Sequence, residues 1–221
     1  YFLDLNYGIK EENLISKYPT LLELANYIKD NRNQERIGNL DWKEILNKDT
    51  SAKLPSSSFI AVFFKFLSFI VFKTFFRVKV KGKEKIEKDK PTIFVANHQS
   101  FLDGFLFNYS VPLKVMKKTY FLATVIHFKS SLMKFMADSS NVVLVDMNKD
   151  IAEVMQILAK LLKENKNIAI YPEGTRTRDG KMDKFKKAFA ILAKELNVDV
   201  QPYVISGAYE LFPANKKFPR P

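Results

Sequence analysis

The chain has 221 residues and no cysteine, so it can form one sizeable domain with a small appendage, and disulfides, thiolate metal sites and a cysteine nucleophile are excluded. The formal net charge of +12 is unevenly spread: residues 1–50 carry 7 Lys/Arg and 9 Asp/Glu, whereas residues 51–221 carry 29 and 15. The basic part is expected to bind an anionic partner, either nucleic acid or anionic lipid.

The N-terminal part divides into a short helical unit, residues 1–32, and a polar connection, residues 33–58. In the first, Thr20 and Glu23 have the spacing of a capping box, and the apolar residues that follow lie on one helical face. The unit is too short to bury a core of its own. The second ends in a run of proline and serine, which predicts a linker with one helix around Trp42.

Residues 59–76 form the most apolar stretch and contain eight of the twenty phenylalanines. Eighteen residues of helix span ~27 Å, slightly less than the ~30 Å of bilayer hydrocarbon. Lys65 and Lys73 interrupt the stretch, and a charge in the middle of a bilayer costs several kcal/mol. The pattern therefore favours a membrane-docking helix in the interface over a complete span, with a buried core helix as the alternative.

From residue 77 onward, short apolar runs predict strands, and apolar residues three or four positions apart predict helices. The expected elements are, by type, strands at 78–82, 91–96, 141–146, 167–171 and 198–206, and helices at 101–110, 151–164 and 185–196. This alternation predicts an α/β fold with a mostly parallel central sheet flanked by helices, preceded by the membrane-associating helical segment.

The first chemical motif contains His98, one of only two histidines, and Asp103, with four residues between them. His98 follows an apolar strand, at the end where α/β sheets bind ligands. A neutral imidazole there can accept the proton of an attacking alcohol, and Asp103 can hold the other ring nitrogen and stabilise the imidazolium. The alternative is that His98 is structural and that Asp103 caps a helix together with Ser100.

The second motif, Glu173-Gly174-Thr175-Arg176, also follows an apolar strand, so we expect it at the same sheet edge as His98. Gly174 permits a close backbone approach or a positive φ, and the guanidinium of Arg176 matches phosphate in a bidentate way. Six basic and two acidic residues lie between positions 176 and 187, for which a solvated basic loop is the alternative.

Together, Asn97-His98-Gln99-Ser100-Phe101-Leu102-Asp103 and Tyr171-Pro172-Glu173-Gly174-Thr175-Arg176 resemble the motifs of the glycerolipid acyltransferase family, typified by bacterial 1-acyl-sn-glycerol-3-phosphate acyltransferases. The resemblance covers about residues 59–221. It implies that His98 is the general base with Asp103 as its partner, and that an acceptor phosphate is bound by Glu173, Gly174, Thr175 and Arg176. Further candidates for substrate binding are Asn97, Lys149, Lys186 and Lys187.

The resemblance also implies an acyl thioester donor, from coenzyme A or acyl carrier protein, with no metal and no other cofactor. It implies a location on the phospholipid membrane, at the cytoplasmic face. Two positions depart from the family pattern: Met147 stands where an arginine is usual, with Lys149 nearby, and Ala188 stands where a glycine is common. The first departure leaves the acceptor open between an acylglycerol phosphate and a lysophospholipid with a larger headgroup.

The chain begins at Tyr1 without a methionine and ends at Pro221, which we interpret as a fragment of a longer protein. Residues 1–32 resemble the second half of an acyl carrier domain, whose phosphopantetheine-bearing serine would lie upstream. That implies an alternative function as the lysophospholipid-recycling acyltransferase part of an acyl-activating fusion protein. A non-catalytic lipid-binding module is the other alternative. Nucleic acid is not expected, because the phenylalanines form an apolar segment and not a base-stacking platform.

Overall fold

The computed structural model describes residues 41–52, 54–56, 59–125, 130–145 and 151–214, with isolated positions at 17, 20, 22, 23, 25–27, 128 and 216. Five parallel strands form one sheet in the order β3-β2-β4-β1-β5. Their bounds are β1 (Thr92–Ala96), β2 (Thr119–Thr124), β3 (Val142–Val145), β4 (Asn167–Ile170) and β5 (Asp199–Tyr203). The prediction of an α/β fold with a mostly parallel sheet is thus confirmed.

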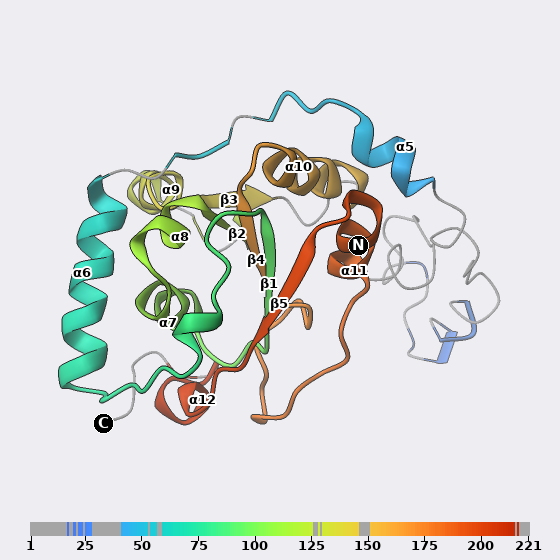
Figure 1. Ribbon diagram of the computed structural model, residues 1–221. Coiled ribbons are helices and arrows are strands. Elements are labelled where there is room, and N and C mark those ends of the chain that lie inside the picture. Colours follow the sequence, from blue (N-terminus) through green and yellow to red (C-terminus); the bar gives the residue numbers. More distant parts are fainter. Residues whose placement is uncertain are drawn as a thin grey trace.

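Helices lie on both faces of the sheet (Figure 1). On one face are α5 (Trp42–Asn47), α10 (Ile151–Lys163) and α11 (Ala188–Leu196). On the other are α7 (Asp103–Ser110) and α8 (Leu113–Lys118), with α6 (Phe59–Thr74) packed outside α7. The remaining described helices are α9 (Ser131–Asp138), which contacts β3, the four-residue α12 (Ala208–Leu211), and a 3-10 turn at Lys83–Lys85.

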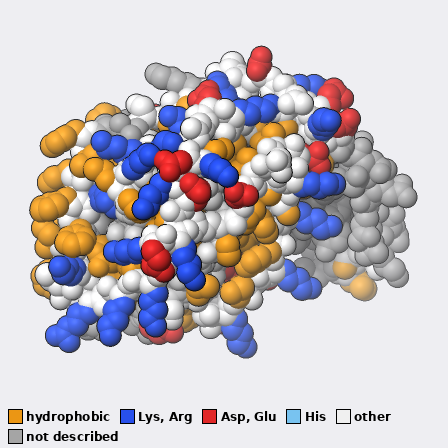
Figure 2. All heavy atoms as spheres, in the orientation of Figure 1, with side chains coloured by type: hydrophobic (Ala, Val, Ile, Leu, Met, Phe, Trp, Pro, Cys, Tyr) orange, Lys and Arg blue, Asp and Glu red, His pale blue; other side chains and the backbone are white. Residues whose placement is uncertain are grey.

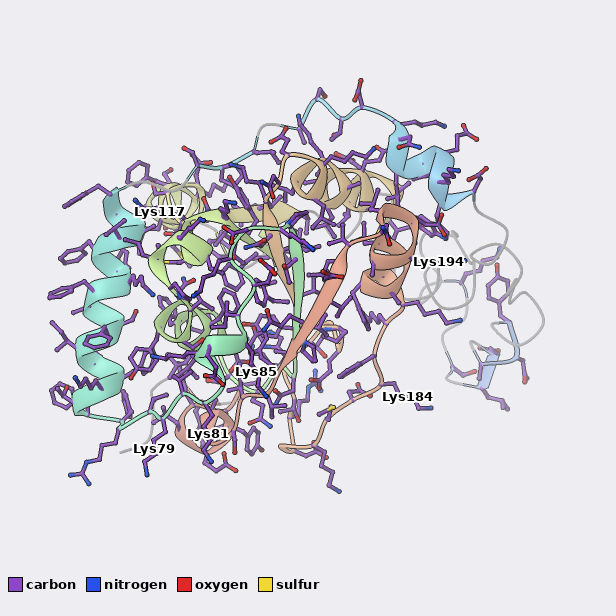
Figure 3. All side chains as sticks on the ribbon, in the orientation of Figure 1. Lys79, Lys81, Lys85, Lys117, Lys184 and Lys194 are labelled. Carbon is purple, nitrogen blue, oxygen red and sulfur yellow. The ribbon has the colours of Figure 1, made fainter. Side chains whose placement is uncertain are left out.

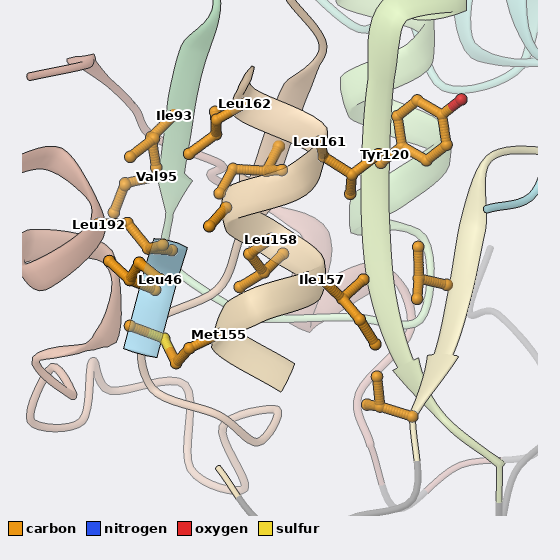
Figure 4. Close-up of a cluster of buried hydrophobic side chains, with 14 residues drawn as sticks. Leu46, Ile93, Val95, Tyr120, Met155, Ile157, Leu158, Leu161, Leu162 and Leu192 are labelled. Atoms are coloured by element: carbon orange, nitrogen blue, oxygen red, sulfur yellow. The ribbon is translucent and has the colours of Figure 1, made fainter. Parts of the chain in front are cut away.

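Strand β1 is buried along its whole length because helices cover both faces of the sheet there, so its successive side chains enter different cores, whereas the edge strand β5 is largely exposed. Ile93 and Val95 of β1 join the core beneath α10, whereas Phe94 between them joins the core beneath α7. The first core is built on the apolar face of α10 and is completed by Leu46 of α5 and Leu192 of α11 (Figure 4). Leu46 is 2% exposed, so α5, expected inside a linker, belongs to the folded body.

The second core fixes α7, the helix that begins at Asp103. Phe107 of α7 is almost fully buried, and its ring meets those of Phe94 at 5.1 Å, Phe121 at 5.4 Å and Tyr203 at 5.3 Å. These three aromatic contacts come from β1, β2 and β5, and aromatic pairs at such separations contribute beyond simple burial. The start of α7 is therefore held in a fixed place relative to the end of β1.

Two predicted features differ from the structure. The strand expected at 78–82 is wrong: Val78 and Val80 are half-buried between exposed residues, but the segment pairs with no strand in the described part of the chain. Conversely, the interior strand β2 is not predicted from the sequence, because α8 runs into it at Thr119 without any intervening glycine or proline. Near the N-terminus, the capping box is confirmed by two backbone contacts, Thr20 N to Glu23 Oε2 at 3.1 Å and Glu23 N to Thr20 Oγ1 at 3.2 Å.

Candidate active site

The predicted base and its partner meet beyond the carboxyl end of β1. His98 lies two residues after the strand, and its Nδ1 is 2.8 Å from Oδ2 of Asp103, the first residue of α7. The Asp103 side chain is completely buried, whereas 23% of the His98 side chain is exposed. Because a carboxylate accepts, the neutral imidazole carries its proton on Nδ1, which leaves Nε2 as the basic atom.

Asp103 also holds the chain that leads into its own helix. Its Oδ2 accepts from the backbone N–H groups of Gln99 at 2.7 Å and Ser100 at 2.9 Å. The capping role and the role as histidine partner, which the sequence presented as alternatives, are thus performed by the same oxygen atom. The other oxygen, Oδ1, is buried and has no hydrogen-bond partner among the described residues.

Glu173 joins the second motif to the first. Glu173 as a whole residue is 4% exposed, and its Oε1 accepts from His98 N at 2.7 Å while its Oε2 accepts from Asp183 N at 2.9 Å. A further bond from Thr177 N to His98 O, at 2.9 Å, fastens the same two loops. Both carboxylate oxygens of Glu173 are therefore engaged by the protein, and their effect is to fix the backbone of the histidine.

The rest of the second motif lies on the surface beside this bridge. Gly174 has φ +79° and Thr175 is exposed, while the half-buried Arg176 places its guanidinium 5.8 Å from the ring centre of Phe101. Lys186 lies against Gly174 so closely that a Cβ there would be 2.5 Å from its Nζ. Within the described part of the chain, neither Arg176 nor Lys186 forms an ion pair, so both charges remain available to an anion.

The further candidates have different surroundings. Asn97 binds the backbone of Ile205 through both ends of its amide, each at 2.8 Å, and so ties the end of β1 to the segment after β5. Lys187 is exposed at the start of α11, and Lys149 lies outside the described residues. No group of three or more His, Asp or Glu side chains suited to a metal ion occurs among the residues with described positions.

Tyr171 is a site residue that sequence reasoning quoted within a motif but gave no role. Its ring stacks on the imidazole of His98, with 4.2 Å between centroids and 14° between planes. Its hydroxyl lies 3.4 Å from that of Tyr203 on β5. Burial raises the pKa of both phenols, so both remain neutral. The available signal was an aromatic residue directly after a buried strand and before Pro-Glu-Gly.

The class of protein is thus an α/β protein with a histidine–carboxylate dyad at the carboxyl edge of a parallel sheet, next to two basic side chains that have no ion-pair partner among the described residues. The chain belongs to the acyltransferase family, because the family model described as Acyltransferase matches residues 77–206. The resemblance to glycerolipid acyltransferases is thereby confirmed, while the carrier-like interpretation of residues 1–32 remains a prediction.

Individual relatives agree with this assignment. A 1-acyl-sn-glycerol-3-phosphate acyltransferase of Chlamydomonas reinhardtii is 35% identical over 146 residues, covering 65% of this chain and 42% of the relative. A chloroplastic one of Arabidopsis thaliana is 29% identical over 151 residues, covering 65% and 40%. The crystal structure of the 1-acyl-sn-glycerophosphate (LPA) acyltransferase from Thermotoga maritima matches with a TM-score of 0.58 and 28% identity, covering 84% of this chain and 66% of that one. The chain thus spans about two fifths of the length of the two curated relatives.

Proposed function

We propose that this chain is the catalytic part of a membrane-associated O-acyltransferase. It moves a fatty acyl group from a thioester of coenzyme A or acyl carrier protein to the free hydroxyl of an acylglycerol phosphate or lysophospholipid. The observation that carries the proposal is the His98–Asp103 contact at 2.8 Å, in a site that also contains the guanidinium of Arg176 over the ring of Phe101. The three relatives described above are acyltransferases named for an acylglycerol phosphate acceptor.

In the proposed reaction, Nε2 of His98 accepts the proton of the acceptor hydroxyl as its oxygen attacks the thioester carbonyl. Asp103 stabilises the imidazolium that results, and such general base catalysis contributes about 10²–10⁴-fold. When the tetrahedral intermediate collapses, the C–S bond breaks and the leaving thiolate takes the proton from the imidazolium. An ester and a free thiol are formed, and no nucleophile from the protein is required.

The acceptor's phosphate is assigned to the surface loop after β4. Arg176 supplies a planar fork for two phosphate oxygens, and Lys186 supplies a second cation next to Gly174. Thr175 is exposed and can donate a hydroxyl hydrogen bond from the same loop. Two cations on one loop suit the doubly charged phosphate monoester of an acylglycerol phosphate better than a singly charged phosphodiester, so we favour the former as the acceptor.

The membrane surface is assigned to α6. Most of its outward residues are large and apolar: Phe59 at its first position is 84% exposed, Phe66 in its middle is 64% exposed, and Phe75 just beyond the helix is 77% exposed. Figure 2 shows hydrophobic side chains along this edge of the molecule, and Figure 3 places Lys79 and Lys81 beyond the last turn of α6. Within the described residues, no helix combines the length and the apolar character needed to cross a bilayer.

Lys65, which interrupts the apolar stretch in the sequence, does not interrupt the apolar surface. Its Nζ is turned inward and donates to the backbone carbonyls of Asn108 and, at 2.8 Å, Val111, at the end of α7. Burial, with the nearby charge of Lys83, lowers the pKa of this amine. We therefore propose that α6 lies in the membrane interface with its phenylalanines in the lipid and basic residues at its end near the headgroups, at the cytoplasmic face.

The test is thiol release from a long-chain acyl-coenzyme A, comparing the wild type with the His98→Ala variant. Two acceptors, acylglycerol phosphate and a lysophosphatidylethanolamine, are offered in separate reactions with detergent. Both reactions are then repeated with an acyl carrier protein thioester as the donor. Release that the variant loses supports the proposal, and the better acceptor identifies the headgroup class. If the wild type releases no thiol from either donor while it still binds liposomes, the alternative of a non-catalytic lipid-binding module is the better account.

A further inference from the structure

The stacked pair of Tyr171 and His98 follows from the topology of the sheet. Strands β1 and β4 are parallel neighbours in which Val95 is paired with Ile170, so the residues that follow each strand leave at the same edge. Tyr171 comes directly after β4 and His98 two residues after β1. Their rings lie at 4.2 Å and 14°, which is a parallel stack over the face of the phenol.

The stack is supported from the side away from the histidine. The Tyr171 ring packs against the aromatic core beneath α7 and is half-buried. Its hydroxyl is 3.4 Å from the hydroxyl of Tyr203, which belongs to β5, the strand on the other side of β1. The ring is thus held between the sheet and the histidine, and it has little freedom to turn away.

Two contacts restrict the orientation of the His98 imidazole, one at the edge of the ring and one at its face. The hydrogen bond between Nδ1 and Asp103 fixes one edge of the ring, but a single hydrogen bond still permits the ring to tilt about it. Tyr171 lies against the face of the ring and removes the tilt. Nε2, the atom that must meet the acceptor hydroxyl, is therefore fixed by both contacts together.

The stack also has an electrostatic consequence. The face of a phenol ring carries negative charge density, and a cation within about 6 Å of its centre is attracted. The imidazole of a general base becomes cationic as it accepts the proton, so the attraction is greatest in the transition state. The carboxylate of Asp103 acts on the same charge, while Glu173 is engaged with the backbone N–H groups of His98 and Asp183.

We propose that Tyr171 is a positioning residue for the general base: its ring fixes the plane of the His98 imidazole and stabilises the positive charge that the imidazole carries during proton transfer. The inference rests on the proposed acyltransferase function, because it assigns Tyr171 a task only if His98 is the base. The hydroxyl of Tyr171 is not needed for this task, since the face of the ring makes the contact.

The first experiment compares wild type, Tyr171→Phe and Tyr171→Leu in the thiol-release assay, with His98→Ala as the inactive reference. Tyr171→Phe keeps the stack and should retain kcat. Tyr171→Leu should lower kcat by between about 2-fold and about 30-fold, the range expected for losing a cation–π contact, with the acceptor KM unchanged. Circular dichroism and thermal melts verify that each variant is folded.

A second series separates electrostatics from packing. Position 171 is filled with phenylalanine and then with its mono-, di- and trifluorinated analogues, which withdraw charge from the ring face and change its volume little. We expect log kcat to fall steadily with each fluorine, while upfield ring-current shifts of the His98 protons show that the stack persists. This series carries the test even if Tyr171→Leu fails to fold.

The outcomes are distinguishable. Suppose that the wild type is active, that His98→Ala inactivates it, and that kcat does not change along the fluorination series. That result overturns the electrostatic role of Tyr171 and leaves the proposed function standing. Equal kcat values for Tyr171→Leu and the wild type overturn the positioning role as well. A wild type that releases no thiol, or a fully active His98→Ala variant, instead overturns the assignment of the base on which the inference rests.

Discussion

Replacing Asp103 by asparagine removes one charge from the site and little else. The amide oxygen can occupy the place of Oδ2 and still accept from His98 Nδ1 and from the N–H groups of Gln99 and Ser100. These two backbone donors fix the orientation of the amide, because its NH₂ group in that place would face them. The amide nitrogen then takes the place of Oδ1, which has no hydrogen-bond partner among the described residues.

The loss is therefore expected in the transition state, where the imidazole is cationic. Two unit charges 2.8 Å apart attract each other by ~6 kcal/mol at an effective dielectric constant of about 20. The neutral amide keeps a hydrogen bond worth about 1–1.5 kcal/mol, which leaves a deficit of about 4.5 kcal/mol. At 1.36 kcal/mol for each factor of ten, kcat should fall by about 10³-fold or more.

The assay is thiol release at saturating donor and acceptor, with a thermal melt of the same samples. Asp103→Ala is the matched comparison, because it also leaves the N–H groups of Gln99 and Ser100 without their acceptor, at ~1–3 kcal/mol each, and so should lower Tm clearly. Asp103→Asn should lose kcat with a much smaller change in Tm. A kcat for Asp103→Asn within about fivefold of the wild type would refute the assignment of Asp103 as the charge that stabilises the imidazolium.

Three further predictions concern the phosphate loop and α6. Arg176→Lys loses the bidentate fork, so the acceptor KM should rise about tenfold in steady-state kinetics with kcat nearly unchanged, and an equal fall in kcat would contradict a binding role. Lys65→Met leaves the carbonyls of Asn108 and Val111 without their donor and should lower the free energy of unfolding by about 1–3 kcal/mol in urea, whereas an unchanged midpoint would show that the contact contributes nothing. Replacing the exposed Phe63 and Phe66 by glutamine should reduce sedimentation with anionic vesicles while sparing turnover of a water-soluble acceptor, and full vesicle binding would exclude α6 as the docking surface.

The sheet could be predicted where periodicity and chemistry agreed. The apolar strands before His98 and before Glu173 were clear in the sequence, and their parallel pairing brings both motifs to one edge. Strand β2 was missed because α8 continues directly into it, so no turn residue marks the boundary. The segment at 78–82 was misjudged for the opposite reason, since alternation shows that a chain is extended but cannot show that a neighbouring strand exists.

The sequence predicted which residues form the site better than it predicted which atoms these residues contact. Position along the chain indicated that Asp103 could serve either as a helix cap or as a partner of His98, and only the atomic arrangement shows that one oxygen does both. Glu173 was grouped with the phosphate ligands because it precedes Arg176, yet its carboxylate binds two backbone N–H groups. Such contacts cross from one strand to another, and spacing within a motif carries no information about them.

Lys65 shows why a charge in an apolar stretch should be judged by its direction. In sequence it argues against a complete membrane span, but the side chain turns inward and donates to carbonyls at the end of α7, so it does not interrupt the apolar outer face of α6. A cation at the carboxyl end of a helix is also favourable to the helix itself. Since the other end of α7 is Asp103, a single eight-residue helix joins the surface assigned to the lipid with the carboxylate that holds the base. In the proposed docking mode, this short helix therefore sets the position of the dyad relative to the membrane.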